Sequence, residues 1–308
     1  MVSVKQVNLS MFEQFYPLLR EIDPKLSEME WYNLFSQPWH QSENYCGYGL
    51  FDDSEMVGFS GLIFSQRSID GQIENFCNLS SWIVKEAYRG HAISLMLALR
   101  KLENYSITDF SATENVISIF KRLGFQELDS QIAALPNILG KLKLNRKLKI
   151  TTDLALISPH LKFPEQLLLQ DHSTCSRCQH LLAEANDEHC YIIFTLVKNA
   201  KFPYSHMQYL GNPELFARYS LAIRQAIAKI GGTPLVLIDR RLLKGTKPAF
   251  CFNLPIKICK LYKSSRLKPE QIDNLYSELM ILDFDPIPPF GWREIISYLK
   301  KHIILANK

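Results

Sequence analysis

The chain has 308 residues with a formal net charge of +4, and 47% of its residues are hydrophobic while 21% are charged. This length suits about two domains of roughly 150 residues each, and the composition is typical of a soluble globular protein. The mild positive charge gives no argument for nucleic-acid binding, and no run of about 18 apolar residues predicts a membrane span. The N-terminal segment lacks the pattern of a secretory signal, and the seven cysteines are scattered, so we expect a reduced, cytoplasmic protein.

The first half of the chain predicts alternating strands and helices. Residues 2–7 alternate like a short strand, and residues 11–23 follow a helical period interrupted by Pro17. Ser27 and Glu30 form a capping-box pattern at the start of a second helix. Further elements are expected in the order strands at 46–51, 56–65 and 75–84, a helix over about 91–103, a strand at 107–112, a helix at 115–123 ended by Gly124, and one or two strands over 125–135.

The second half predicts a similar order of elements. Residues 177–198 indicate a hairpin that turns near Asn186 and Asp187. After a strand at 205–210, Asn212 is expected to cap a long helix that starts at Pro213 and ends at Gly231 and Gly232, before a buried strand at 234–239. A last helix is expected over 270–282, with Ile272, Leu275, Tyr276 and Leu279 on one face. A duplicated fold and chance both explain the shared order.

Residues 141–149, KLKLNRKLK, contain five basic residues and no acidic residue. We interpret this segment as a basic linker, and a binding patch is the alternative. The predicted division is therefore a first domain over 1–140, a linker over 141–150 and a second domain over 151–308.

Residues 84–97, VKEAYRGHAISLML, lie where a predicted strand meets a predicted helix. A helix N-terminus offers unpaired N–H groups and the positive end of the helix dipole, and together these can hold phosphate. Gly90, Ala92 and Ser94 are small enough for a ligand to approach the backbone, and Arg89 adds a positive charge. The segment is either a pyrophosphate site or an ordinary tight turn.

Residues 45–130 resemble the GCN5-related N-acetyltransferase superfamily. The resemblance rests on three pieces in the family's order, namely WIVKEAYRGHAIS, which is similar to the acyl-coenzyme A signature, the strand segment ITDFSATEN, and the closing segment IFKRLGF. It implies the mixed α/β acyl-CoA N-acyltransferase fold, and the shared order of the two halves suggests two tandem domains, with the second degenerate. The second half contains no match to the coenzyme signature.

The resemblance also implies a reaction and a set of binding residues. Ile83 and Val84 would bond the pantetheine arm of the coenzyme through their backbones, and Asn115 would lie near its thiol end. The pyrophosphate would be surrounded by Arg89, Gly90, His91, Ala92, Ile93 and Ser94. The implied reaction moves an acetyl or other acyl group directly from coenzyme A to an amine of a small molecule or peptide. An acyl-CoA would be the co-substrate, and no metal is expected.

Three departures from the family pattern raise an alternative. Ala92 stands where the family has glycine, and Phe120 stands where the family often has a proton-donating tyrosine. Glu74 is the candidate base, although it could equally be a solvated residue at the start of a strand. A catalytically inactive binding or regulatory protein with the same fold is therefore the second hypothesis. We expect His91 to be a surface residue near phosphate, not a catalyst.

Two other clusters suggest partners. The segment DHSTCSRCQH holds Cys175 and Cys178 between histidines, a pattern that is incomplete as a zinc site and also fits small core residues. The stretch 240–268 holds nine basic residues and no acidic residue, which indicates either solvated strand faces or an anionic partner. No nucleic acid is expected as a partner, and a homodimer is compatible with the sequence.

Overall fold

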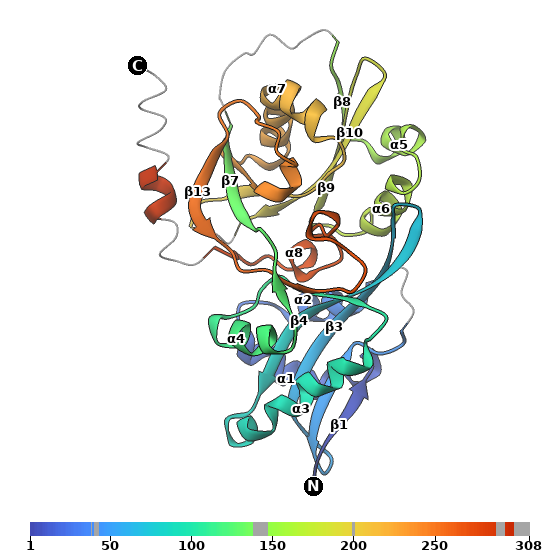
Figure 1. The fold of residues 1–308 in the computed structure, drawn as a ribbon, viewed down its shortest axis with the longest axis vertical. Coiled ribbons are helices and arrows are strands. Elements are labelled where there is room, and N and C mark those ends of the chain that lie inside the picture. Colours follow the sequence, from blue (N-terminus) through green and yellow to red (C-terminus); the bar gives the residue numbers. More distant parts are fainter. Residues whose placement is uncertain (38, 40–42, 138–146, 199–200, 288–292, 299–308) are drawn as a thin grey trace. The chain divides into compact units, whose positions relative to one another are not determined.

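The computed structural model describes residues 1–37, 39, 43–137, 147–198, 201–287 and 293–298 (Figure 1). The chain divides into two compact units, and neither is a single continuous segment. The first unit comprises residues 1–127, 260–268 and 276–282, and the second comprises residues 128–259, 269–275 and 283–308.

The first unit is built on a seven-stranded mixed sheet with the order β1-β2-β3-β4-β5-β14-β6. Its strands are β1 (Val2–Val7), β2 (Gly47–Asp52), β3 (Glu55–Ile69), β4 (Gln72–Val84), β5 (Ser106–Asp109), β14 (Leu261–Lys263) and β6 (Gln126–Glu127). Every described pairing in this sheet is antiparallel except β4 with β5, which are parallel. A parallel pair requires a crossover connection, and here α3 (Ala92–Ala98) lies between the two strands in the chain.

Helices cover both faces of this sheet, with α1 (Phe12–Ile22) behind the strands and α3 in front of them in Figure 1. Phe15 of α1 stacks on Phe59 of β3 with 4.4 Å between the ring centroids. The predicted capping box is confirmed, since Ser27 and Glu30 bond each other's backbone at the start of α2 (Glu28–Phe35). Gly124, which follows α4 (Glu114–Arg122), has the expected left-handed φ of 87°.

The second unit contains another seven-stranded mixed sheet, with the order β8-β9-β10-β11-β12-β7-β13. Its strands are β8 (Lys149–Thr151), β9 (Cys178–Ala185), β10 (Glu188–Val197), β11 (Tyr204–Leu210), β12 (Leu235–Asp239), β7 (Gln131–Pro136) and β13 (Phe252–Lys257). The predicted hairpin is confirmed, because Asn186 and Asp187 turn β9 into β10 with φ values of 52° and 64°. β11 and β12 are the parallel pair of this sheet.

The helices of the second unit are α5 (Leu154–Ile157), α6 (Glu165–His172) and the long α7 (Pro213–Gly231). The side chain of Asn212 caps α7, Pro213 is its first residue, and Gly232 ends it with φ of 64°, as the sequence predicts. Ile223 and Ile227 of α7 lie in the buried core of the unit with β-strand residues such as Phe194 and Val236.

The two sheets have the same strand order, which the duplicated-fold interpretation predicts. In each sheet the sixth position is filled by a strand from the other half of the chain, with β14 in the first sheet and β7 in the second. Each of these strands pairs antiparallel on both sides. The predicted mixed α/β fold class is confirmed, and the two sheets are consistent with a tandem arrangement of two such units.

This exchange of strands explains where the structure departs from the predicted division. The second unit begins at Leu128, and not at residue 151, because β7 pairs with β12 and β13. Most of the expected linker, residues 141–146, lies outside the described residues. The expected helix over 270–282 is wrong, since only α8 (Glu278–Ile281) is helical and Tyr276 has a left-handed φ of 57°. Residues 269–275 belong to the second unit while residues 276–282 belong to the first, so one continuous helix cannot serve both.

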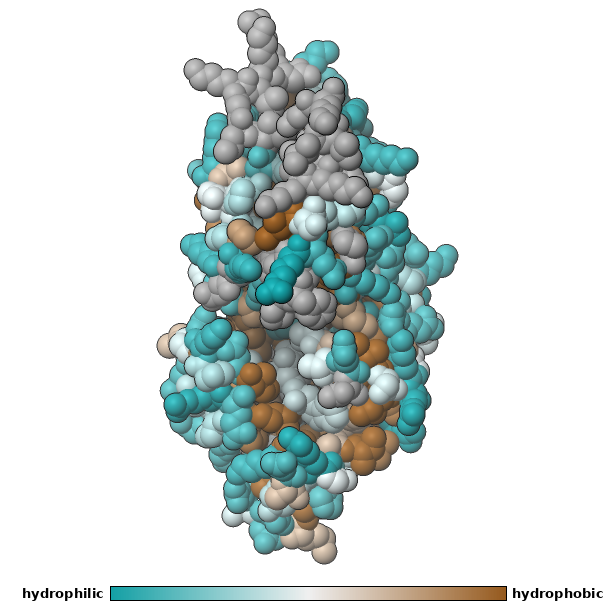
Figure 2. All heavy atoms as spheres, turned by 90° about the vertical axis from the view of Figure 1, so that its left-hand side faces the viewer, coloured by the Kyte–Doolittle hydropathy of each residue, from teal (hydrophilic) through white to brown (hydrophobic). Residues whose placement is uncertain are grey.

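None of the helices in the described part of the chain is both long enough and apolar enough to cross a membrane. Figure 2 shows one face of the protein, on which hydrophilic side chains predominate and hydrophobic residues gather in small patches.

Candidate active site

β4 and β5 of the first unit separate at a defined point. Their parallel pairing runs from Phe76 opposite Ser106 to Leu79 opposite Asp109, where β5 ends, while β4 continues to Val84. The register between β3 and β4 shifts at the same place and leaves Ser80 without a partner on β3. A bulge bends its strand, so the one at Ser80 turns β4 away from its parallel neighbour. Beyond it, no strand among the described residues pairs with the edge of β4 that faced β5, and an extended ligand could bond there.

Ile83 and Val84, the residues that the resemblance assigns to the pantetheine arm, lie in this stretch of β4, where they pair with β3 on one edge only. The indole Nε1 of Trp82 and the hydroxyl oxygens of Ser80 and Ser81 are buried there without hydrogen-bond partners among the described residues. Buried polar atoms are normally satisfied, so these atoms mark the opening as a place where a ligand could supply partners.

The turn after β4 is wound into a short 3₁₀ helix over Glu86–His91, and α3 follows directly. The N–H groups of Tyr88 and Ala92 are already bonded, to the carbonyls of Lys85 and Arg89, so they are not free for phosphate. The helix expected over 91–103 is shorter than predicted, because α3 ends at Ala98 and gives way to another 3₁₀ turn.

The side chains of this turn face solvent. Arg89 lies 3.7 Å from Glu86 in an exposed ion pair, and a Cβ placed on Gly90 would meet no atom within 4 Å. His91 and Ile93 are exposed, while Ala92 and Ser94 are half-buried. The turn therefore presents one strong positive charge, Arg89, held only by a surface ion pair of the kind that contributes little to stability.

Phe120 lies inside the apolar core of the first unit. It packs against Phe125, with 4.7 Å between ring centroids, and against Trp82 at 6.4 Å. Trp82 is on the part of β4 beyond its pairing with β5, so Phe120 lies next to the opening but offers no proton. Asn115 is the second residue of α4, and its side chain lies outside the described part of the structure.

Glu74 is not the solvated residue that one interpretation of the sequence expected. Its side chain is buried, its Oε2 lies 3.2 Å from Nη2 of Arg266, and it faces Arg67 across the β3–β4 ladder. Arg266 comes from the segment 260–268 that folds into the first unit. Glu74 precedes the paired stretch of β4, whereas the opening follows that stretch, and this position disfavours it as the base.

A cluster of buried polar residues lies at the end of β5, where the two strands separate. Asp109 is the last residue of β5 and is 6% exposed, while Glu278 of α8 is 1% exposed. Asn78 donates a short hydrogen bond to Glu278 and accepts one of 2.9 Å from Thr108. Lys260 is fully buried, with its Nζ 5.5 Å from the centroid of the Phe110 ring.

The two carboxyl groups of this cluster have perturbed pKa values. Burial, assisted by the negative charge of Glu278, raises the pKa of Asp109 to about 8. Burial also raises the pKa of Glu278, but contacts with Ser111 and Asn78 and the charge of Lys260 oppose that rise. At neutral pH Asp109 therefore carries a proton, and Glu278 is the carboxyl better supported as an anion.

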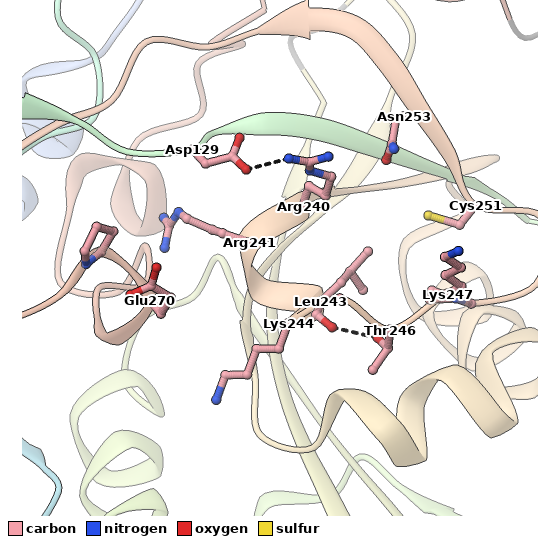
Figure 3. A pocket seen from close by; sticks show the side chains of 13 residues that line it. Asp129, Arg240, Arg241, Leu243, Lys244, Thr246, Lys247, Cys251, Asn253 and Glu270 are labelled. Carbon is pink, nitrogen blue, oxygen red and sulfur yellow. Dashed lines mark hydrogen bonds and ion pairs between the residues drawn. The ribbon is translucent and has the colours of Figure 1, made fainter.

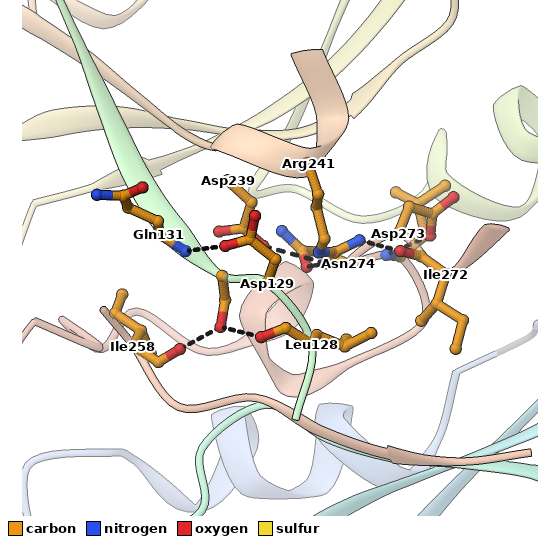
Figure 4. Close-up of polar contacts among 11 residues, drawn as sticks. Leu128, Asp129, Gln131, Asp239, Arg241, Ile258, Ile272, Asp273 and Asn274 are labelled. Carbon is orange, nitrogen blue, oxygen red and sulfur yellow. Dashed lines mark hydrogen bonds and ion pairs between the residues drawn. The ribbon is translucent and has the colours of Figure 1, made fainter. Parts of the chain in front are cut away.

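The corresponding position of the second unit is arranged differently. Asp239 is the last residue of β12, the fifth strand of its sheet, as Asp109 is of β5. Arg241 binds Asp239 at 3.1 Å and also binds Asn274, in the network shown in Figure 4. β11 has the same kind of bulge, at Gln208, and separates from β12 after Met207. The second unit thus keeps the opening but pairs its buried aspartate with an arginine.

Sequence reasoning did not identify Asp109, Glu278 or Asn78, and it considered Lys260 only as part of the basic stretch 240–268. Asp109 could have been suspected, because polar residues at the carboxyl end of a buried strand commonly serve sites in α/β folds. Glu278 and Lys260 carried no such signal, since only the folding of distant segments onto the first unit brings them to β5.

The other clusters considered in the sequence have structural partners. Nδ1 of His180 lies 2.7 Å from the hydroxyl of Tyr191, and a hydrogen bond from Cys178 lowers the pKa of Cys175 to about 6. Within the described ranges, no three or more His, Cys, Asp or Glu side chains are grouped to hold a metal ion. The basic stretch 240–268 is divided between the units, and the burial of Lys260 shows that it is not one solvated surface.

No protein-family model matches the chain, and no curated protein matches its sequence. Solved structures do match its fold. A GCN5-related N-acetyltransferase from Anabaena variabilis is 13% identical with a TM-score of 0.56, over 85% of this chain and 72% of that one. A GCN5-related N-acetyltransferase from Kribbella flavida is 12% identical with a TM-score of 0.53, over 85% and 70% of the two chains.

A putative acetyltransferase from Pyrococcus horikoshii is 13% identical with a TM-score of 0.52, over 91% of this chain and 94% of that chain. Identities this low establish the fold and nothing finer. The chain therefore has the fold of the GCN5-related N-acetyltransferases, and the resemblance seen in the sequence is confirmed at that level.

Proposed function

We propose that this protein transfers an acyl group from an acyl-coenzyme A to an amine of a small molecule or peptide, and that the first unit carries the chemistry. The observation that carries the proposal is the opening between β4 and β5 at Ser80, with the protonated carboxyl of Asp109 beside it. The fold shared with known N-acetyltransferases supports the same reaction class.

The edge of β4 that lies beyond its pairing with β5 is the proposed place for the pantetheine arm. An extended arm with two amide groups can bond a free strand edge as an added strand does, through the backbones of Ile83 and Val84. Arg89 is the proposed partner of the pyrophosphate, together with the turn from Gly90 to Ser94. Because two amides of this turn are already bonded, we expect the charge of Arg89 to contribute more than the backbone does.

Asp109 and Glu278 are the proposed acid and base. In the transfer, the amine nitrogen bonds to the acyl carbon, the carbon–sulfur bond breaks, the amine loses a proton and the thiolate gains one. A neutral Asp109 can give the proton to the sulfur, and the Glu278 carboxylate can accept the proton of the amine. This assignment supplies the acid that Phe120 cannot supply, and it replaces Glu74, whose carboxylate is paired with Arg266.

The second unit is proposed to be degenerate. Its buried Asp239 lies 3.1 Å from Arg241 and is engaged in that ion pair, so the arrangement proposed for Asp109 is not repeated there.

Calorimetric titration with acetyl-CoA tests the coenzyme site. We expect binding by the wild type, and weaker binding by at least about tenfold when Arg89→Glu places a negative charge beside the pyrophosphate. Arg20→Glu, an exposed reversal on α1, is the matched control and should bind as the wild type does. No binding by the wild type at millimolar acetyl-CoA would refute the proposal.

Release of free thiol in the presence of a broad panel of amines tests turnover. Asp109→Asn should keep acetyl-CoA affinity and lose most of the turnover, because an amide has no acidic proton to give. Turnover by Asp109→Asn at the wild-type rate would remove Asp109 from the mechanism. Binding without turnover of any amine would favour the alternative, an inactive binding or regulatory protein.

A further inference from the structure

The second unit contains a pocket of about 560 Å³ beyond the carboxyl end of β12 (Figure 3). This volume is within the range of about 300–1,000 Å³ that is usual for small-molecule sites, and it exceeds the needs of a single inorganic ion. The pocket is formed mainly by the 3₁₀ turn Arg240–Leu243, the loop that follows it, and the start of β13.

Four cationic and two carboxylate side chains line the pocket. The two arginines are already engaged, because Arg240 lies 2.8 Å from Asp129 and Arg241 lies 3.1 Å from Asp239. The hydrogen bond from Arg240 holds the pKa of Asp129 below its usual value, so that pair is ionised at neutral pH. Lys244 and Lys247 have no ion-pair partner among the residues that the structure describes. Glu270, the other carboxylate of the lining, offsets one of these two charges, so the pocket keeps a net charge of about +1.

The loop that carries these lysines has a fixed shape. Lys244 and Gly245 both adopt left-handed backbone conformations, with φ of 46° and 81°. Thr246 closes the turn with bonds of 2.9 Å from its N–H and 2.7 Å from its hydroxyl to the carbonyl of Leu243. The left-handed backbone conformation is unfavourable for lysine, and backbone strain of this kind is often found at ligand sites.

We propose that this pocket binds a small molecule bearing a phosphate or pyrophosphate group. Lysine ammonium groups bind phosphate as point charges, whereas bidentate recognition of a carboxylate normally uses arginine, and both arginines here are occupied by the protein's own carboxylates. The side chain of Asn253 adds a polar group at one wall. Leu243, Pro248 and Pro269 add apolar surface for the rest of the molecule.

This site does not depend on the acyl transfer proposed for the first unit. Every residue that lines the pocket belongs to the second unit, and none takes part in the cluster around Asp109. Of the basic stretch 240–268, this proposal uses only the residues at 240–247 that line the pocket. Lys260 and Arg266 belong to the first unit, where Lys260 is buried and Arg266 is paired with Glu74.

Cys251 provides a local readout, because it lines the pocket and is half-buried. The rate of its alkylation by iodoacetamide is followed by mass spectrometry in the absence of any coenzyme, with inorganic pyrophosphate or citrate added. Cys175 and Cys259 serve as internal references in the same sample. The test variant is Lys244→Glu with Lys247→Glu, and the matched control is Lys162→Glu with Lys201→Glu, two exposed reversals in the same unit.

We expect pyrophosphate to slow alkylation of Cys251 in the wild type and the control, and the double variant to need at least about tenfold more pyrophosphate for the same protection. Equal protection of the double variant would overturn the proposal, as would the absence of protection in the wild type at millimolar pyrophosphate. Equal protection by citrate would show a general anion site and overturn the phosphate assignment. Loss of protection in the control would show that net charge alone matters, which also overturns it.

Discussion

Replacing Asp109 with asparagine keeps the shape of the side chain and removes its titration. The amide oxygen can still accept the 3.2 Å bond from the Ser111 N–H. In the folded protein the pKa of Asp109 is raised from 3.8 to about 8, mainly by burial. A raised acid pKa means that the folded state resists ionisation, so wild-type stability falls as pH rises from about 4 to about 8 and is constant above that window. Integrated from pH 5 to pH 9, this shift amounts to about 4 kcal/mol.

The assay is urea unfolding of the wild type and Asp109→Asn at pH 5, 7 and 9, followed by tryptophan fluorescence. Three of the four tryptophans, Trp31, Trp39 and Trp82, belong to the first unit, so the signal reports mainly on the unit that contains Asp109. Asp187→Asn is the matched control, because Asp187 is exposed in the β9–β10 turn of the second unit.

The expected result is a stability difference between wild type and Asp109→Asn that grows by about 4 kcal/mol, in favour of the variant, from pH 5 to pH 9. When both proteins also carry Glu278→Gln, the stability difference should grow less between pH 5 and pH 9, because the charge of Glu278 contributes to the raised pKa of Asp109. Parallel stability curves for wild type and Asp109→Asn across this range would refute the reasoning, whatever their absolute offset.

Three further outcomes are expected. Lys260→Met should lower the free energy of unfolding by roughly 3 kcal/mol at pH 8, because it removes the buried cation that supports the charged form of Glu278. The loss should be smaller at pH 5, and equal losses at the two pH values would contradict the pairing of Lys260 with Glu278. Cys175 should be the fastest cysteine to alkylate at pH 7, since its pKa of about 6 leaves it mostly thiolate there. Cys178→Ala should slow its alkylation several-fold by removing the hydrogen bond that stabilises the thiolate. An unchanged rate would show that Cys178 does not cause the lowered pKa. Gly232→Ala should cost about 1 kcal/mol in urea unfolding, because the φ of 64° suits glycine, and a neutral effect would show that the end of α7 can rearrange.

Local sequence signals located many elements correctly. The capping box of Ser27 and Glu30, the Asn186–Asp187 hairpin and the Asn212 cap of α7 depend on residues a few positions apart, so the chain carries them without help from the rest of the fold. The resemblance also indicated Ile83 and Val84, which lie on β4 beyond its pairing with β5, and their role in binding the coenzyme stays a prediction.

The sequence predictions failed where neighbouring residues in the chain belong to different units of the fold. The apolar spacing of Ile272, Leu275 and Leu279 favours a helix, but these residues are divided between two units and the helix does not form. The same division separates the basic residues at 240–247 from Lys260 and Arg266, which their proximity in the chain had joined.

The sequence by itself placed the turn at Arg89, because that signal depends on residue type and short spacing. Through the resemblance of residues 45–130 to a known family, it also indicated the class of fold and the phenylalanine at position 120 where the family often has a proton donor. The tertiary structure decided which carboxyl groups are buried together. Asp109 acquires a pKa of about 8 because the fold removes it from water and the charge of Glu278 adds to that effect. Such a pKa depends on desolvation and on charges from segments far apart in the chain, and no local pattern encodes either of them.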